Sequence, residues 1–407
     1  MGKIKINNFG PVKSGFQGNS GWLDINKVTV FVGNQGSGKS TVAKLISTFL
    51  WIEKALVRGD YEKDWFEKKN KLRNQFLPYH RISSYIYPNT VIEYEGEAYS
   101  IRYRNDSLAI TENDSKSYPL PQIMYVPAER NFITYLKGAR ELKLSSASLQ
   151  DFNTEYFNAK QEMKGAMRLP INDADIEYNK QYNNLYLKVD GEKKIEISDA
   201  SSGFQSFVPL YLVSEYLANS VKKHSENKEL MSSEEEIRFK KGVQEIWKND
   251  SLTDEQKRIA LSALSARFNK AAFINIVEEP EQNLFPSSQW KMLQSLLEFN
   301  NINDNNKLII TTHSPYLISY LTLAVKAGEL GQRLKTGEQN ATLGQIVPLA
   351  AIVDATALSI YELDEKTGAI NPLETFNGLP SDENRLNAML DEGNELFAQL
   401  LEIQQQL

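Results

Sequence analysis

The chain has 407 residues, of which 41% are hydrophobic, enough for one large α/β domain with insertions or for two domains of ordinary size. Its formal net charge of −6 argues against a strongly basic nucleic-acid-binding protein, although it allows a local basic face. The absence of cysteine excludes disulfides and thiolate metal sites, and with three histidines a zinc enzyme is not expected. No segment reaches the about 18 consecutive apolar residues of a membrane span, and the N-terminus lacks a secretory signal. We therefore expect a soluble, cytoplasmic protein without a membrane partner.

The first 50 residues predict two or three short strands and then a phosphate-binding loop. Residues 33–41 read GNQGSGKST, follow the apolar run 28–32 and precede a helix-compatible stretch. In such a loop, glycines let backbone N–H groups face a phosphate, Lys39 reaches the β- and γ-phosphates, and the Ser40 hydroxyl coordinates Mg²⁺. We predict that ATP is bound by Asn34, Gln35, Gly36, Ser37, Gly38, Lys39, Ser40 and Thr41.

The middle of the chain is harder to read. Residues 51–130 predict a lobe of helices and a β-hairpin that turns at Glu95-Gly96, ending in a buried strand at 122–127. Residues 131–176 predict mainly polar helix and loop. The string SSGFQS at 201–206 precedes an apolar helix, and serine and glycine at a helix start can bind an anion, although an ordinary helix cap explains them equally well.

Residues 221–270 carry many charges of both signs with little apolar periodicity. This pattern favours a solvated helical hairpin, with a partner-docking arm as the alternative. We divide the chain into a nucleotide-binding core of 1–50 and 270–407, the lobe 51–130, a helical signature lobe 131–220 and the helical insertion 221–270.

Residues 273–280 read FINIVEEP, an apolar strand that ends in two carboxylates. At the carboxyl edge of a sheet, Glu278 would hold Mg²⁺ and Glu279 would orient and deprotonate the attacking water. Paired acids also occur as ordinary polar strand ends, but a strand of this kind downstream of a complete phosphate loop favours the catalytic interpretation.

The next strand, 307–312, runs into TTHSP at 311–315, where His313 could sense the γ-phosphate or the attacking water as a neutral imidazole. A purely structural histidine is the alternative. The last helix, roughly 382–405, carries apolar residues along one face, for which we expect packing into the core, with an interface as the second interpretation.

In this order, the loop at 33–41, the S-G-x-Q string, the E-E-P strand end and the T-H-S turn resemble ABC-type ATPases, and more closely their OLD/RecF-like branch. The segments INNFGPVKS (6–14), VPAER (126–130), EEPEQNLFP (278–286) and TTHSPYLIS (311–319) extend the resemblance over most of the chain. It implies an α/β, ABC-type P-loop ATPase head with a mixed sheet, a helical signature lobe and a short helical insertion.

The resemblance also implies an oligomer. The signature residues Ser202 and Gly203, with Gln205, would close on the γ-phosphate held by Lys39 of another subunit, giving composite sites in a head-to-head homodimer. Ser202 would then act in trans.

Three departures from the ABC pattern stand out. Glu278 replaces the usual aspartate, Phe204 replaces the second signature glycine, and no clear Q-loop glutamine follows the phosphate loop. Gln122 is one candidate for the last role, but Glu129 and Arg130 in VPAER resemble the branch's own version and are preferred.

Three functions then compete. A transporter motor is disfavoured by the opening strand, the insertion and the EEPE run. A RecF/SMC-like ATPase of DNA repair or DNA maintenance, with DNA as ligand, is the second hypothesis. The preferred one is an ATP-dependent sensor and scaffold of an anti-phage system, resembling the ATPase subunits of PARIS and, next, Septu. That resemblance implies a separately encoded nuclease partner and a phage-derived trigger. The acids after His313, namely Asp354, Glu362, Asp364 and Glu365, are interpreted as surface charges and not as the metal cluster of a nuclease.

Overall fold

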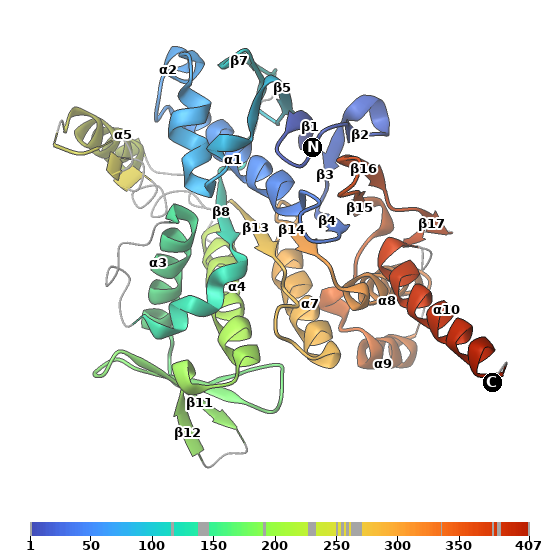
Figure 1. Ribbon diagram of the computed structural model, residues 1–407. Coiled ribbons are helices and arrows are strands. Elements are labelled where there is room, and N and C mark those ends of the chain that lie inside the picture. The colour runs from blue at the N-terminus through green and yellow to red at the C-terminus, as the bar shows by residue number, and fades with distance from the viewer. Residues whose placement is uncertain are drawn as a thin grey trace.

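The computed structural model describes most of the chain, and Figure 1 shows how its elements are arranged. The described residues are 2–114, 118–136, 146–189, 193–226, 233–249, 251–253, 256–257, 260–261, 271–334, 336–376, 378–380 and 384–405.

A seven-stranded mixed sheet of order β2-β16-β15-β4-β14-β13-β8 forms the centre of the molecule. The strands from β15 to β8 are parallel, whereas β16 runs antiparallel to β15. Every residue of β4 and β13 is buried, as expected for parallel strands covered on both faces. The predicted α/β class with a mixed sheet is therefore confirmed. The strands are β2 (Gly15–Phe16), β4 (Val28–Gly33), β8 (Pro121–Val126), β13 (Ala272–Glu278), β14 (Lys307–Thr312), β15 (Leu358–Leu363) and β16 (Ala369–Pro372).

A second, antiparallel sheet has the order β3-β1-β5-β6-β7, and helix α1 (Lys39–Arg58) packs between it and the central sheet (Figure 1). On the helix, Phe49 stacks on Tyr94 of this sheet. Strands from the first 25 residues and from the expected lobe share the sheet, since Ile6 pairs with Ile92. The strands are β1 (Gly2–Phe9), β3 (Leu23–Ile25), β5 (Ile86–Glu95), β6 (Tyr99–Arg104) and β7 (Ser107–Glu112).

Helices α3 (Ala147–Glu162), α4 (Ser202–Glu226) and α7 (Pro286–Asn301) pack with the central sheet into a second hydrophobic cluster. Below them in Figure 1 lies a four-stranded antiparallel sheet that the sequence reading missed. Its strands are short and largely polar, so their alternation is weak. They are β9 (Met167–Arg168), β10 (Asp175–Asn179), β11 (Asn184–Val189) and β12 (Lys193–Glu196).

Helix α5 (Ser233–Lys248) is the main described part of the insertion, and the rest of the predicted hairpin lies largely outside the described residues. The Trp247 ring contacts the rings of Tyr61 and Trp65, with the Tyr61 ring centroid 4.2 Å away. This end of α5 therefore rests on the lobe next to α2 (Lys63–Glu67) and the helical turn Leu72–Phe76.

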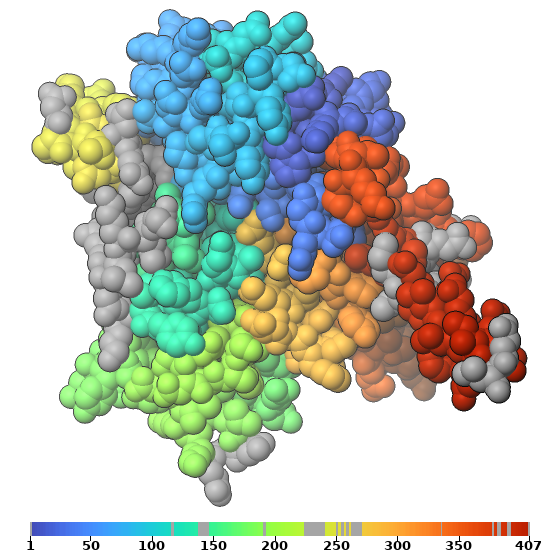
Figure 2. Space-filling view, viewed as in Figure 1, coloured from blue at the N-terminus to red at the C-terminus, as the bar shows by residue number. Residues whose placement is uncertain are grey.

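Beyond β14 the chain adds α8 (Pro315–Gly331), α9 (Gly337–Ile346), the strand pair β17 (Thr375–Phe376) and β18 (Leu379–Pro380), and α10 (Arg385–Gln405). We expected α10 to pack into the core. Leu386 in its first turn does so, but the helix then projects from the body (Figures 1 and 2). Its apolar side chains are 42–62% exposed, namely Leu396, Phe397, Leu400, Leu401 and Ile403. Periodicity failed here because a core face and an exposed face carry the same pattern.

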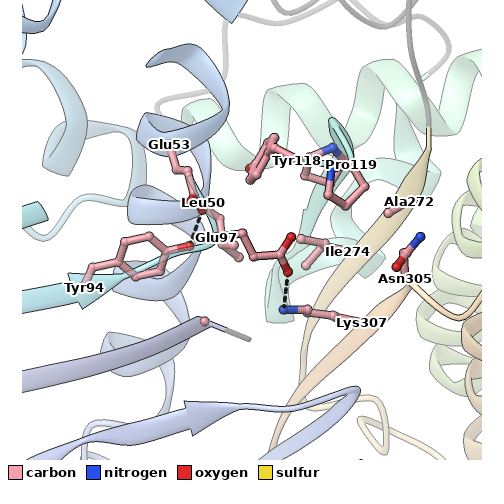
Figure 3. A pocket seen from close by; sticks show the side chains of 12 residues that line it. Leu50, Glu53, Tyr94, Glu97, Tyr118, Pro119, Ala272, Ile274, Asn305 and Lys307 are labelled. Atoms are coloured by element: carbon pink, nitrogen blue, oxygen red, sulfur yellow. Dashed lines mark hydrogen bonds and ion pairs between the residues drawn. The ribbon is translucent and has the colours of Figure 1, made fainter. Parts of the chain in front are cut away.

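Glu53 of α1 fastens the helix to the hairpin of β5 and β6. Its buried carboxylate accepts hydrogen bonds from the Tyr94 hydroxyl at 2.6 Å and from the Ala98 N–H at 2.7 Å. Burial raises the pKa of Glu53, and these hydrogen bonds oppose the rise. A small cavity beside this carboxylate is also lined by Glu97 and Lys307, whose ion pair is drawn in Figure 3.

None of the helices within the described ranges combines the length and apolarity needed to cross a membrane.

Candidate functional site

The phosphate loop joins β4 to α1 through glycines with positive φ. Gly36 has φ 74° and Gly38 has φ 104°, conformations that L side chains rarely adopt. Helix α1 begins directly after Gly38, without a side-chain N-cap, so its first N–H groups are free of that competitor for an anion. A Cβ on Gly36 would meet nothing within 4 Å, so the loop has space beside it for a ligand. The buried Ser37 Oγ has no hydrogen-bond partner among the described residues.

Lys39 is buried at the start of α1, and its ammonium lies over the loop. Nζ donates to the Gly33 carbonyl at 2.7 Å and to the Asn34 carbonyl at 2.8 Å. Burial lowers the pKa of Lys39, while the nearby carboxylates, Glu279 and Glu281 foremost, oppose the shift. A desolvated ammonium held against the loop is suited to bind phosphate oxygens.

The other predicted residues of the loop differ in exposure. Asn34, Gln35 and Gly36 are exposed, and Asn34 Oδ1 accepts from the Gln35 N–H at 2.8 Å. Ser40 is half-buried and Thr41 is buried in the first turn of α1. The tip of the loop is thus open, and its base is fixed in the core.

Strand order brings the predicted acids and His313 to the same edge as the loop. In the central sheet β14 separates β4 from β13, with Thr312 paired to Val32 and Thr311 paired to Glu278. The carboxyl ends of these three parallel strands therefore lie side by side, which is where ligands bind in such sheets.

Glu278 is buried and held by three groups. The Tyr125 hydroxyl donates to Oε1 at 2.5 Å, the Ala128 N–H donates to Oε2 at 3.1 Å, and Lys44 Nζ lies 3.7 Å from Oε1. Lys44 stands four residues after Ser40, on the same face of α1. This contact brings the helix that carries Ser40 against Glu278.

Glu279 leaves the strand in a strained conformation, with φ 45°. Its N–H donates to the Thr311 carbonyl at 2.8 Å, which fixes the turn, and its Oε1 lies 3.5 Å from His313 Nδ1. The contact with His313 is the main cause that lowers the pKa of Glu279. A carboxylate ionised at neutral pH is the form required of a general base.

His313 lies between two carboxylates, because Nδ1 is 3.4 Å from Glu281 Oε1 as well. The contact with Glu279 raises the pKa of His313, and Glu281 adds to the rise. The two carboxylates shift His313 towards the imidazolium, whereas our expectation was that it acts as a neutral imidazole. Glu281 is a third acid at this edge of the sheet, and the strand pattern did not reveal its position.

Glu281 orients the switch turn from within the core. Its Oε1 accepts from the Thr312 hydroxyl at 2.7 Å and from the His313 N–H at 2.9 Å. Burial raises the pKa of Glu281 despite these bonds. Ser314, which follows His313, donates from its hydroxyl to Gln289 Oε1 at 2.7 Å. Two site residues that the sequence analysis missed had a signal in the sequence. Glu281 is the third acid of the EEPE run, and Lys44 stands four residues after Ser40 on the same face of α1.

The structure separates the three candidates for the Q-loop role. Gln122 pairs with Phe273 at the beginning of β8, at the opposite end of the strands from the acids. Glu129 and Arg130 follow the end of β8, next to Glu278. Glu129 is exposed, whereas Arg130 is fully buried and donates hydrogen bonds to backbone carbonyls, among them those of Ser206 and Glu278.

The signature residues also differ from one another. Ser202 is exposed at the first position of α4, and Gly203 is half-buried. Gln205 is buried, where its amide donates to the Ser198 carbonyl at 2.7 Å and accepts from the Tyr135 hydroxyl at 3.2 Å. Ser202 can thus face a second chain, while the Gln205 side chain is engaged within its own.

The donor set fits Mg²⁺-ATP. The loop supplies positive-φ glycines, a buried lysine and an uncapped helix N-terminus, and the Ser40 hydroxyl and Glu278 offer oxygen ligands. Within the described ranges no group of three or more histidine or acidic side chains forms a metal site of its own. Mg²⁺ usually binds through one or two protein oxygens plus substrate phosphates, so such a group is not needed.

A family model described as "AAA ATPase domain" matches residues 255–318, the stretch that carries β13, both acids and His313. This part of the chain is similar to an ATPase domain. Its match covers a limited part of the sequence, and the phosphate loop lies outside it. No curated protein gave a match.

Among solved structures, this chain is similar to the SMC head domain from Thermotoga maritima, at 12% identity and a TM-score of 0.35, over 92% of this chain and 98% of that one. A Pyrococcus furiosus Smc head domain with an extended coiled coil, bound to the C-terminal domain of ScpA, is 10% identical with a TM-score of 0.35. That match covers 98% of this chain and 100% of the other. The ATP-binding cassette MJ0796 bound to ADP and Pi is 11% identical with a TM-score of 0.30. That match covers 92% of this chain and 100% of the other. Similarity at these values does not indicate a function for this chain.

Proposed function

We propose that this chain is an ABC-type ATPase that binds and hydrolyses Mg²⁺-ATP, closes head to head with a second copy, and acts as sensor and scaffold of an anti-phage complex. The observation that carries the ATPase assignment is the convergence of Lys39, Glu279 and His313 at one edge of the central sheet. The charge of Glu279 raises the pKa of Lys39, and the charge of Lys39 lowers the pKa of His313, so the three groups share one electrostatic site.

Each residue has a distinct task in this proposal. The loop N–H groups and Lys39 bind the phosphates, and Ser40 and Glu278 hold Mg²⁺, which when bound neutralises phosphate charge. Glu279 accepts the proton of the attacking water. His313, oriented through its backbone by Glu281, places an N–H donor beside Glu279 and the expected γ-phosphate position.

The proposed dimer follows from the signature. Ser202 lies exposed at the N-terminus of α4, where a hydroxyl and uncommitted N–H groups suit an anion. ATP bound to Lys39 of one copy would complete its coordination through Ser202 of the other. ATP can drive this assembly only as far as it binds the closed pair better than the separate heads.

The ATPase assignment is tested with two variants. Lys39→Ala should abolish ATP binding because it removes the buried ammonium. Glu279→Gln should still bind ATP but lose at least about 100-fold in turnover, the typical contribution of a general base, and accumulate as a closed dimer. Equilibrium binding of a fluorescent ATP analogue and phosphate release report the two effects. Unchanged turnover in Glu279→Gln would refute the assignment of the general base.

The defence role rests on the resemblance of the four motifs to the OLD/RecF-like branch, and a separately encoded nuclease is its expected partner. The test is to express the chain with its neighbouring reading frame and to measure the plating efficiency of a phage panel. Protection that is lost in the Lys39→Ala variant supports the role. ATP-stimulated, salt-dependent DNA binding without protection would instead support DNA repair or maintenance.

A further inference from the structure

The buried guanidinium of Arg130 contacts both the end of β13 and the signature helix α4. In the proposed dimer, these two motifs of one chain act on different nucleotides. Arg130 lies in the helical turn Ala128–Tyr135 and is fully buried. Its Nη1 donates to the Glu278 carbonyl and its Nη2 to the Glu279 carbonyl, both at 2.7 Å. Its Nε donates to the carbonyl of Ser206 at 3.1 Å, in the first turns of α4. The same side chain therefore holds the end of β13 and the start of the signature helix.

A second contact fixes the same two segments. Asn283, in the turn after Glu279, donates from its amide to the Ser206 hydroxyl at 3.0 Å. A Cβ on Gly203 would lie 3.0 Å from the Asn283 carbonyl oxygen, so the turn and the signature approach as closely as glycine allows. Movement of the turn cannot leave the start of α4 undisturbed, because interfaces packed this closely do not deform continuously.

Arginine is the side chain that this position requires. Its planar fork presents donors in several directions at once, whereas the lysine ammonium is a compact point charge. Burial lowers the pKa of Arg130 to about 10, so the group stays charged at neutral pH, with Glu281, Glu279 and Glu278 opposing the shift. Because this cation donates hydrogen bonds to backbone carbonyls of separate segments, it fixes the position of those segments relative to one another.

We propose that Arg130 is a positioning residue that couples the two nucleotide sites of the dimer by fixing the Glu279 turn against the Ser202 end of α4. The inference rests on the proposed function, in which Glu279 acts on the nucleotide of its own chain and Ser202 on that of its partner. When hydrolysis shifts either the Glu279 turn or the Ser202 end of α4, Arg130 passes the movement to the other motif of the same subunit. The second nucleotide site of the dimer is thereby affected. This role differs from the Q-loop role that the resemblance suggested for Arg130.

The test compares three full-length variants with the wild-type chain. Arg130→Lys keeps the charge and removes the fork. Ser206→Ala removes only the hydroxyl that Asn283 contacts, and it tests the contact between the turn and α4 on which the role of Arg130 depends if Arg130→Lys does not fold. Ser214→Ala is the matched control, because Ser214 is also buried in α4 and also accepts a side-chain amide, that of Asn275 at 2.9 Å, away from the turn.

For each folded variant, ATP affinity, kcat and the Hill coefficient for ATP are measured. We expect a wild-type Hill coefficient above 1. Arg130→Lys and Ser206→Ala should bring it towards 1, and Arg130→Lys should lower kcat about tenfold, with ATP affinity changed less than about twofold, since only interactions specific to the closed state are lost. Ser214→Ala should keep the Hill coefficient.

Several results would overturn the inference: a wild-type Hill coefficient of 1, unchanged cooperativity in both test variants, an equal loss in Ser214→Ala, or a loss of kcat that merely follows a loss of ATP affinity. Failure of the proposed function is distinguishable, because it would abolish complementation between Lys39 and Ser202 variants of the otherwise unaltered chain. Intact complementation with unchanged cooperativity would refute only the role of Arg130.

Discussion

Glu279 and His313 form the contact on which the chemistry of the site depends most. The pairing lowers the pKa of Glu279 from its ordinary 4.5 and raises that of His313 from 6.5. Its contribution to stability is therefore fully present between these two values. It is lost as the pH rises through the raised pKa of His313, and also as the pH falls through the lowered pKa of Glu279. Both side chains are partly exposed, so solvent screens the pair.

An NMR titration of the histidine ring protons checks this pairing. We expect His313 to titrate above 6.5 in the wild-type chain and to move towards that value in Glu279→Gln, because an amide does not stabilise the imidazolium as a carboxylate does. The His313→Gln variant assigns the resonance. An identical titration of His313 with and without the Glu279 carboxylate would show that the two groups do not interact.

At this scale the sequence predicted more of the site than of its support. The loop glycines, Lys39, Glu278, Glu279 and His313 belong to short motifs whose spacing reflects their chemistry. Glu281, Tyr125 and Arg130 act through contacts between segments far apart in the chain, and no local pattern encodes such contacts. The carboxylates of Glu279 and Glu281 both come from the turn after β13, and only the pairing of β13 with β14 brings them to His313.

The hairpin of β5 and β6 shows how an element is fixed by one buried carboxylate. A Cβ on Gly96 would overlap the Glu53 carboxylate, which is held by the Tyr94 hydroxyl and the N–H groups of Ala98 and Tyr99. Glycine in this turn therefore lets α1, the helix of the phosphate loop, reach the antiparallel sheet. The sequence predicted the turn at Glu95-Gly96 but not the carboxylate that fills the space beside it.

We expect Gly96→Ala to lower the free energy of unfolding by about 1–3 kcal/mol, because displacing Glu53 leaves buried donors without their acceptor. Thermal unfolding measures the change. Gly393→Ala serves as the control, since Gly393 is an exposed helical residue of α10 with nothing within 4 Å of its Cβ position, and alanine should be neutral or stabilising there. Equal stability of the Gly96→Ala and wild-type chains would contradict the described packing.

Elements with strong patterns were predicted better than those with weak ones. The buried runs of β4, β13 and β14 and the long helix after the phosphate loop follow from apolar composition and length. The polar sheet β9 to β12 was missed, and α10 was expected in the core. In both cases the deciding factor is what the element contacts, which composition alone does not contain.

For the whole molecule, strand order is what assembles the site. Three parallel strands, β4, β14 and β13, bring the phosphate loop, His313 and the two acids to one edge, although up to 280 residues separate the first motif from the last. The sequence predicted the α/β class and the mixed sheet. It did not predict that the first strand, β1, joins β5 in a separate antiparallel sheet, because pairing between distant strands leaves no local signal.

The central claim is that each nucleotide site is shared by two copies of the chain, and complementation tests it most directly. Lys39→Ala disables nucleotide binding in one copy, and Ser202→Arg disables the signature of the other. In a mixed dimer both lesions fall in one composite site, and the other site is intact. We predict that each variant alone is inactive, and that verified mixed dimers recover a substantial part of the ATP turnover per intact site. No recovery in verified mixed dimers would contradict the shared site.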